Sequence, residues 1–162
     1  MDDHRQSGYS LFELIITLAL ASIFAGLAAP SFAEYIDTSR LRSATEAIAS
    51  DFRKTRILAI QSGQNQYINF QNTGSNWCYS IATETSKACD RSGGSSADFS
   101  RIKLDKVAFG NKPSIAFSPL RGSARNGRIT LSTASGKSAS VIVSPLGRIR
   151  TCSSQTTGYT PC

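Results

Sequence analysis

Near its N-terminus the chain has a long apolar stretch, which is followed by an amphipathic one. Residues 14–29 are all apolar or small, which approaches the length that crosses a membrane. After Pro30, apolar residues recur at three- and four-residue steps or near multiples of them, as in a helix with one buried face. The pattern predicts a helix over residues 31–62 that continues the apolar one, with a kink at Pro30 and a cap at Gly63. The recurring apolar positions are Leu41, Ala44, Ile48, Phe52 and Ala59.

Beyond the helix, short β-type stretches alternate with turns rich in glycine, serine, asparagine and proline. The segment 89–100 is too polar and glycine-rich for a strand, so a loop is expected there. One long helix followed by an antiparallel β-sheet predicts an α+β fold. The predicted strands cover residues 66–71, 77–83, 101–109, 114–118, 128–133, 139–144 and 148–152.

One charged residue lies within the apolar start of the chain. Glu13 carries a carboxylate that is costly in hydrocarbon unless a cation pairs with it. A secretory signal peptide is the alternative for an apolar N-terminus, but such a peptide begins with a positively charged region. Here the first eight residues contain Asp2, Asp3 and Arg5, which disfavours a signal peptide.

The N-terminal stretch GYSLFELIITLALASIFAGLAAPSF, residues 8–32, resembles the class III signal of type IV prepilins and type II secretion pseudopilins. The resemblance implies that a prepilin peptidase cuts after Gly8 and methylates the new N-terminus at Tyr9. It also implies that Glu13 pairs with the terminal amine of a neighbouring pilin during assembly. The expected organisation is a leader at 1–8, a transmembrane and assembly half of the helix at 9–30, an amphipathic half at 31–63, and a β-rich head at 64–162.

This resemblance also implies a location for the chain. A single-pass protein of the inner membrane is expected before assembly. After assembly, the protein is expected at the cell surface or in the periplasm, as part of a pilus or pseudopilus.

Positive charge is concentrated in the last third of the sequence. The net charge is +7, and Asp105 is the last acidic residue. This asymmetry favours an anionic partner such as nucleic acid or a lipid headgroup, and the alternative is a basic face that serves only solubility. The basic residues after Asp105 are Lys106, Lys112, Arg121, Arg125, Arg128, Lys137, Arg148 and Arg150.

Arg148 and Arg150 form a pair within the last predicted strand. In a strand, residues i and i+2 point to the same face about 6.6 Å apart, close to the spacing of successive phosphates along a nucleic-acid strand. Guanidinium groups are well shaped to bind phosphate oxygens, and Gly147 permits a tight turn that keeps the approach clear. The pair is therefore suited to hold a nucleic-acid backbone without reading bases, although exposed strand faces often carry arginines that bind nothing.

Nearly the whole chain resembles the GspH/FimT branch of the pilin-like proteins, which includes the minor pilins FimT and FimU. One stretch that carries this resemblance is GRITLSTASGKSASVIVSPLGRIR, residues 127–150. FimT pilins bind DNA through a G-R-x-R motif during natural transformation, and Gly147, Arg148 and Arg150 occupy that motif here. The alternative is a FimU- or GspH-like adaptor without DNA binding. Three further residues join the candidate DNA site by charge alone, namely Arg121, Arg125 and Lys137.

Four cysteines lie at loop-like positions, and their spacing fits no C-x-x-C zinc or redox motif. Two local disulfides, Cys78 to Cys89 and Cys152 to Cys162, are the simplest of the three possible connectivities. Disulfides of this kind indicate an oxidising compartment outside the cytosol.

The sequence offers little for catalysis, and no enzymatic activity, metal or cofactor is expected. The single histidine, His4, falls in the predicted leader, so histidine-dependent nucleophiles and metal sites are unavailable. No phosphate-binding glycine loop is present. The aromatic residues Phe70, Trp77 and Tyr79 alternate like core residues, an interpretation that is favoured over base stacking.

Overall fold

The computed structural model describes residues 10–162 except 75, 86–88, 90–91 and 157, and it leaves out the side chains of 27–30. Gly8, Tyr9 and His4 therefore lie outside the described residues. The chain divides into two compact units, Met1–Ile36 and Asp37–Cys162. We call the second of these the globular unit.

A single helix, α1 (Leu11–Ser62), joins the two units. Its apolar side chains up to Phe24 are exposed, and it is long and apolar enough to cross a membrane. Thr17 and Ser22 donate their hydroxyls to helix carbonyls at 2.9 and 2.8 Å, which satisfies their polar groups within the helix. The predicted continuation of the helix beyond Pro30 is confirmed. Gly63 follows α1 with a φ of 67°, the left-handed conformation of a helix C-cap.

The strands form two antiparallel sheets. The first has the order β2-β1-β4, and the second has the order β3-β5-β6-β7. Each predicted strand is confirmed to within one residue at either end, and so is the α+β fold. The expectation of one sheet is wrong, because β3 pairs with β5 and not with a strand of the first sheet. The strands are β1 (Gln66–Asn72), β2 (Trp77–Ala82), β3 (Ile102–Ala108), β4 (Ser114–Phe117), β5 (Gly127–Thr133), β6 (Ser138–Val143) and β7 (Ile149–Cys152).

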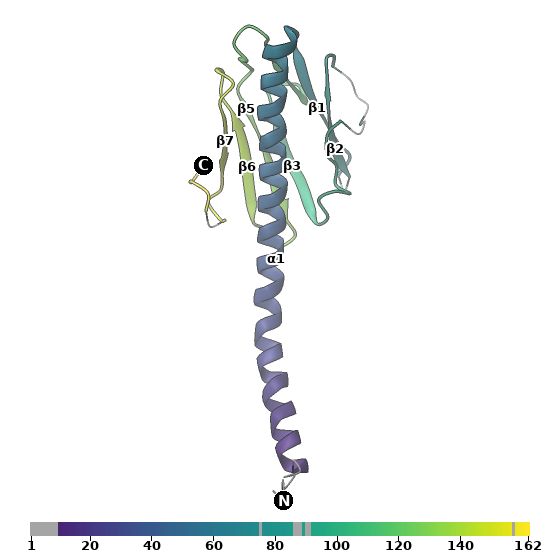
Figure 1. Ribbon diagram of the computed structural model, residues 1–162, viewed down its shortest axis with the longest axis vertical. Coiled ribbons are helices and arrows are strands. Elements are labelled where there is room, and N and C mark those ends of the chain that lie inside the picture. The colour runs from purple at the N-terminus through teal and green to yellow at the C-terminus, as the bar shows by residue number, and fades with distance from the viewer. Residues whose placement is uncertain (1–9, 75, 86–88, 90–91, 157) are drawn as a thin grey trace, which may run out of the picture. The chain divides into compact units, whose positions relative to one another are not determined.

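Within the globular unit, α1 lies across both sheets, with β5, β6 and β7 to one side and β1 and β2 to the other (Figure 1). Phe52 of α1 is fully buried, and its ring centroid lies 6.1 Å from that of Phe70 in β1. Phe70, Trp77 and Tyr79 are also buried, so their interpretation as core residues is confirmed. The described buried hydrophobic side chains all lie between Leu41 and Cys152. A fragment of residues 31–162 therefore retains the whole of this core.

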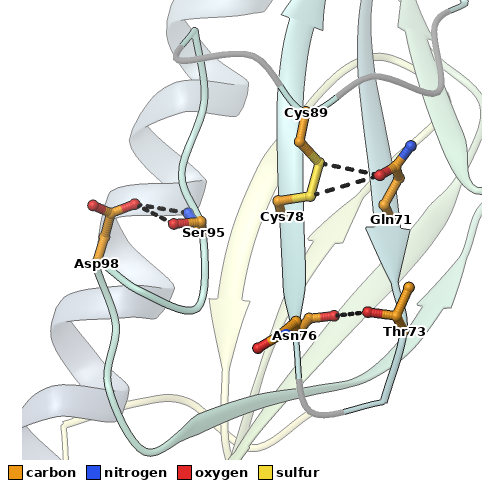
Figure 2. Close-up of a disulfide and its surroundings, with 7 residues drawn as sticks. All are labelled: Gln71, Thr73, Asn76, Cys78, Cys89, Ser95 and Asp98. Atoms are coloured by element: carbon orange, nitrogen blue, oxygen red, sulfur yellow. Dashed lines mark hydrogen bonds between the residues drawn. A yellow bond between two sulfur atoms is a disulfide. The ribbon is translucent and has the colours of Figure 1, made fainter.

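The connection from the first sheet to the second returns along the edge of β2. Tyr79 N–H donates to the carbonyl of Gly94 at 2.9 Å, and Ser92 Oγ bonds both backbone groups of Ile81. The disulfide between Cys78 and Cys89 holds the start of this connection, and Figure 2 shows it beside Gln71. This contact covers the backbone groups that an edge strand would otherwise expose.

A buried phenol links α1 to β2. Tyr79 Oη donates to the Asp51 carboxylate at 2.7 Å. Burial, followed by this carboxylate, raises the pKa of Tyr79 far above its ordinary value. The phenol therefore stays a neutral hydrogen-bond donor, and its role is to hold the helix against the sheet.

Candidate nucleic-acid interface

The predicted arginine pair lies at the start of β7, which is an edge strand of the second sheet. Arg148 and Arg150 are exposed, while Ile149 between them is partly buried and packs against the core. The strand begins one residue after Arg148, because the backbone of Arg148 closes a turn. Its N–H donates to Ser144 Oγ at 3.1 Å, and its carbonyl accepts from Ser144 N–H at 3.0 Å. The alternation that places both arginines in solvent is as predicted.

Gly147 is buried and has a φ of 71°. A Cβ at this position would lie 1.8 Å from the carbonyl oxygen of Gly122, in the loop between β4 and β5. The prediction that Gly147 keeps an approach open for a ligand is wrong, because a neighbouring backbone fills that space. Arg56 of α1 donates its Nε–H to the same carbonyl at 3.1 Å, so helix and loops meet here. Gly147 is needed for the packing of two loops.

This packing brings further arginines to the same end of the globular unit. Ala124 N–H donates to the Pro145 carbonyl at 3.1 Å, which ties the loop holding Arg121 and Arg125 to the loop preceding Arg148. The Arg125 guanidinium also lies over Gly110, where a Cβ would meet its Nη1 at 3.1 Å. Arg121, Arg125 and Arg148 therefore lie at the same end of the globular unit, and their membership of one DNA site stays a prediction.

Lys137 does not belong to this group. It precedes β6, whereas Arg148 lies beyond the other end of that strand. Its Nζ donates to Thr38 Oγ1 of α1 at 3.1 Å. A six-residue strand spans about 20 Å, so the structure separates Lys137 from the arginine pair.

Arg128 is a candidate residue that the sequence reasoning left out of the site. In the register of the second sheet, Arg128 of β5 faces Ile142 of β6, and Ile142 faces Arg150 of β7. Two strand spacings separate the arginine backbones by about 10 Å on one face of the sheet. An open groove of about 430 Å³ beside this row is lined by Lys106, Arg128 and Ile142, among others. The register of the strands places Arg128 in line with Arg150, and the sequence of β5 alone does not indicate this.

Two ion pairs lie within the described residues, Lys54–Asp51 and Arg101–Asp37, and neither includes an arginine of the β4–β5 loop, β5 or β7. Uncompensated charges of one sign raise the local concentration of anionic ligands. Among the described residues, no group of His, Cys, Asp and Glu side chains is placed to hold a metal ion. The surface is thus suited to binding an anion through guanidinium groups.

The C-terminal tail fixes the other end of β7. A disulfide joins Cys152, the last residue of β7, to Cys162, and the two cystines are the local pairs favoured from the sequence. Thr151 Oγ1 donates to the Glu46 carboxylate of α1 at 3.2 Å. Tyr159 packs nearby, and burial followed by the negative charge of Glu46 raises its pKa to about 12. Arg150 therefore projects from a strand that is anchored at both ends.

Two family models match the chain. The model for the Type II transport protein GspH matches residues 44–147, more than half of the sequence. The chain belongs to the GspH family. The model for the prokaryotic N-terminal methylation motif matches residues 3–29. The GspH match ends at Gly147, so Arg148 and Arg150 lie just outside it.

One curated protein and one solved structure are similar to parts of the chain. The Type II secretion system protein H of Xanthomonas campestris pv. campestris is 44% identical over 59 residues, which cover 36% of this chain and 35% of the relative. The match thus spans about a third of that relative's length. The type IV minor pilin FimU of Pseudomonas aeruginosa has a TM-score of 0.47 and 15% identity, over 68% of this chain and 91% of the FimU chain.

Family membership confirms the pilin-like class that the N-terminal stretch predicts. The GspH-family chain is a minor pilin or pseudopilin. Its methylation motif and the apolar start of α1 fit a protein that is anchored in the membrane and later joins a pilus or pseudopilus. Glu13 lies exposed in the first turn of α1, and its role in assembly stays a prediction.

Proposed function

We propose that the globular unit binds extracellular DNA without sequence preference, as part of a type IV pilus that serves natural transformation. The observation that carries this proposal is the exposed arginine pair, Arg148 and Arg150, at the start of an edge strand that the core and a disulfide hold in place. The planar guanidinium forms paired hydrogen bonds to phosphate oxygens and loses less freedom per hydrogen bond than a lysine side chain does. No base-reading element is needed for such binding.

The second sheet supplies further phosphate contacts on this proposal. Arg128 lies in the same cross-strand row as Arg150, and Lys106 lines the groove beside it. Arg121 and Arg125 belong to the loop that packs against the loop preceding Arg148. Lys137 is not part of this proposal, because it lies at the other end of β6.

The proposal is tested by titrating two unrelated DNA duplexes with the 31–162 fragment and its R148A/R150A variant. Loss of two phosphate contacts is expected to weaken binding to both duplexes equally, on the order of 30-fold at about 0.15 M salt. The matched control is R40A/R53A, which removes the same charge from exposed positions on α1 and is expected to change affinity by less than about threefold. Equal affinities for the two double variants would contradict the proposal.

A second candidate function is that of a structural adaptor in a type II secretion pseudopilus or at a pilus tip. The GspH family match and the type II secretion relative favour it. On this alternative, the arginine surface contacts other minor subunits. If the 31–162 fragment binds partner pilins tightly but does not bind DNA at physiological salt, the result would support the adaptor function over DNA binding.

We also propose that a prepilin peptidase cleaves after Gly8 and methylates Tyr9, and that Glu13 then pairs with this amine on a neighbouring subunit. The match to the N-terminal methylation motif supports this step. Intact-mass measurement of the protein from membranes is expected to give a chain that begins at Tyr9 and carries one added methyl group. A chain that retains its first eight residues, or one cut after the apolar stretch, would contradict it.

A further inference from the structure

Two surface loops of the globular unit contain the same tripeptide. Ser-Pro-Leu occupies residues 118–120 and again 144–146, and a glycine and an arginine follow each copy in opposite orders. Each loop is closed by a short backbone hydrogen bond of 2.9 Å, from Gly122 to Ser118 and from Gly147 to Ser144. Proline adds a fixed φ to each turn. The loops therefore present their tips with little conformational freedom.

The leucines of these loops project into solvent. Leu120 is 85% exposed and Leu146 is 80% exposed, the highest values among the large hydrophobic side chains that the structure describes. Because Gly122 and Gly147 are in contact, the two leucine backbones lie within a patch on the order of 15 Å across. Ile60 of α1 borders Gly122 and adds apolar surface at the base of the patch.

An arginine accompanies each leucine. Arg121 follows Leu120 directly, and Arg148 lies two residues after Leu146, and both arginines are exposed. We call Leu120, Arg121, Leu146 and Arg148 the loop patch. Since no acidic residue follows Asp105, the segments that build the loop patch are cationic throughout. Its partner must therefore accept both positive charge and apolar side chains.

The geometry of the loop patch distinguishes among anionic partners. A DNA backbone accepts the arginines but offers no apolar environment to the leucines. A folded protein partner would need a preformed pocket for each of these two exposed leucines. A bilayer of anionic phospholipid accepts projecting leucines among its acyl chains and places phosphates beside the arginines without any preformed pocket.

We infer that the loop patch is a peripheral binding site for anionic phospholipid bilayers. Leu120 and Leu146 insert below the headgroups, and Arg121 and Arg148 bind headgroup phosphates. Two leucines and two arginines give reversible attachment and not permanent anchoring. This inference is independent of DNA binding, because phosphate binding in water does not require the leucines.

The test is sedimentation of the 31–162 fragment with vesicles of phosphatidylcholine alone and with about a third phosphatidylglycerol. Binding is expected only to the anionic vesicles. L120S/L146S is expected to lower the partition coefficient roughly tenfold for each leucine, and R121Q/R148Q about fivefold for each arginine. The matched control F32S/Y35S removes two exposed aromatic residues from α1 and is expected to leave the partition coefficient unchanged. Thermal melting verifies that each variant is folded.

The inference would be overturned if the wild-type fragment did not bind anionic vesicles, or if the L120S/L146S variant bound them like wild type. Equal binding to neutral and anionic vesicles would also overturn it, because the arginines would then not contribute to binding. The same L120S/L146S variant is expected to bind DNA like wild type. A fragment that binds DNA but not vesicles would therefore contradict the proposed membrane binding without contradicting the proposed DNA binding.

Discussion

Gly147→Ala is expected to lower the free energy of unfolding of the 31–162 fragment by about 2–4 kcal/mol. Two costs combine at this position. The φ of 71° is unfavourable for any residue with a Cβ, and the added methyl group would overlap the Gly122 carbonyl oxygen. To relieve this overlap, the loops that hold Arg121 and Arg148 must separate. Urea denaturation measures the loss of stability, and DNA titration is expected to show weaker binding as well.

Gly136→Ala is the matched control for that substitution. Gly136 also has a positive φ, 84°, but nothing lies within 4 Å of a Cβ placed there. It is therefore expected to show the backbone cost alone, about 1–2 kcal/mol, and to bind DNA normally. If both alanine variants lower the free energy of unfolding by the same amount, the close packing of Gly147 on Gly122 does not contribute to stability, and the account of Gly147 is contradicted.

Removing the C-terminal disulfide with C152S/C162S is expected to lower the free energy of unfolding by about 2.5–3 kcal/mol. The bond closes a loop with a sequence separation of 10, so its loss frees the tail in the unfolded chain. In the folded protein, the end of β7 loses its covalent link to the tail. Faster amide exchange is therefore expected at Ile149 and Arg150, and DNA binding is expected to weaken.

The second disulfide supplies the control for this experiment. Cys78 and Cys89 have a sequence separation of 11, which predicts nearly the same loss of stability for C78S/C89S. Cys78 belongs to β2, which lies on the opposite side of α1 from β7 (Figure 1), so amide exchange at Arg150 and DNA affinity are expected to stay as in the wild type. Equal changes at Arg150 in both variants would show that global stability alone controls β7.

Local patterns account for most of what was predicted from the sequence. The three- and four-residue spacing of Leu41, Ala44, Ile48 and Phe52 predicts the buried face of α1, and these residues are buried. The alternation of Arg148, Ile149 and Arg150 predicts two exposed arginines around a residue that packs on the core. Such features depend only on neighbours within a few residues, which a single sequence displays directly.

The predictions that were wrong or incomplete all concern features that depend on contacts between segments distant in the sequence. Nothing in β3 indicates that it pairs with β5, and so the division into two sheets was not predicted. Gly147 was interpreted as an opening for a ligand because its partner, Gly122, lies in another loop. Arg128 joins Arg150 only through the register across Ile142, whereas Lys137 is separated from them by the length of β6.

The central claim is that Arg148 and Arg150 contact DNA phosphates. Its most direct test is the salt dependence of DNA affinity for the 31–162 fragment and for R148A/R150A. Each lost phosphate contact reduces the slope of log K against log salt concentration by about 0.9, so the variant's slope is expected to be shallower by about 1.8. The R40A/R53A control is expected to keep the wild-type slope. Equal slopes for wild type and R148A/R150A would contradict the claim.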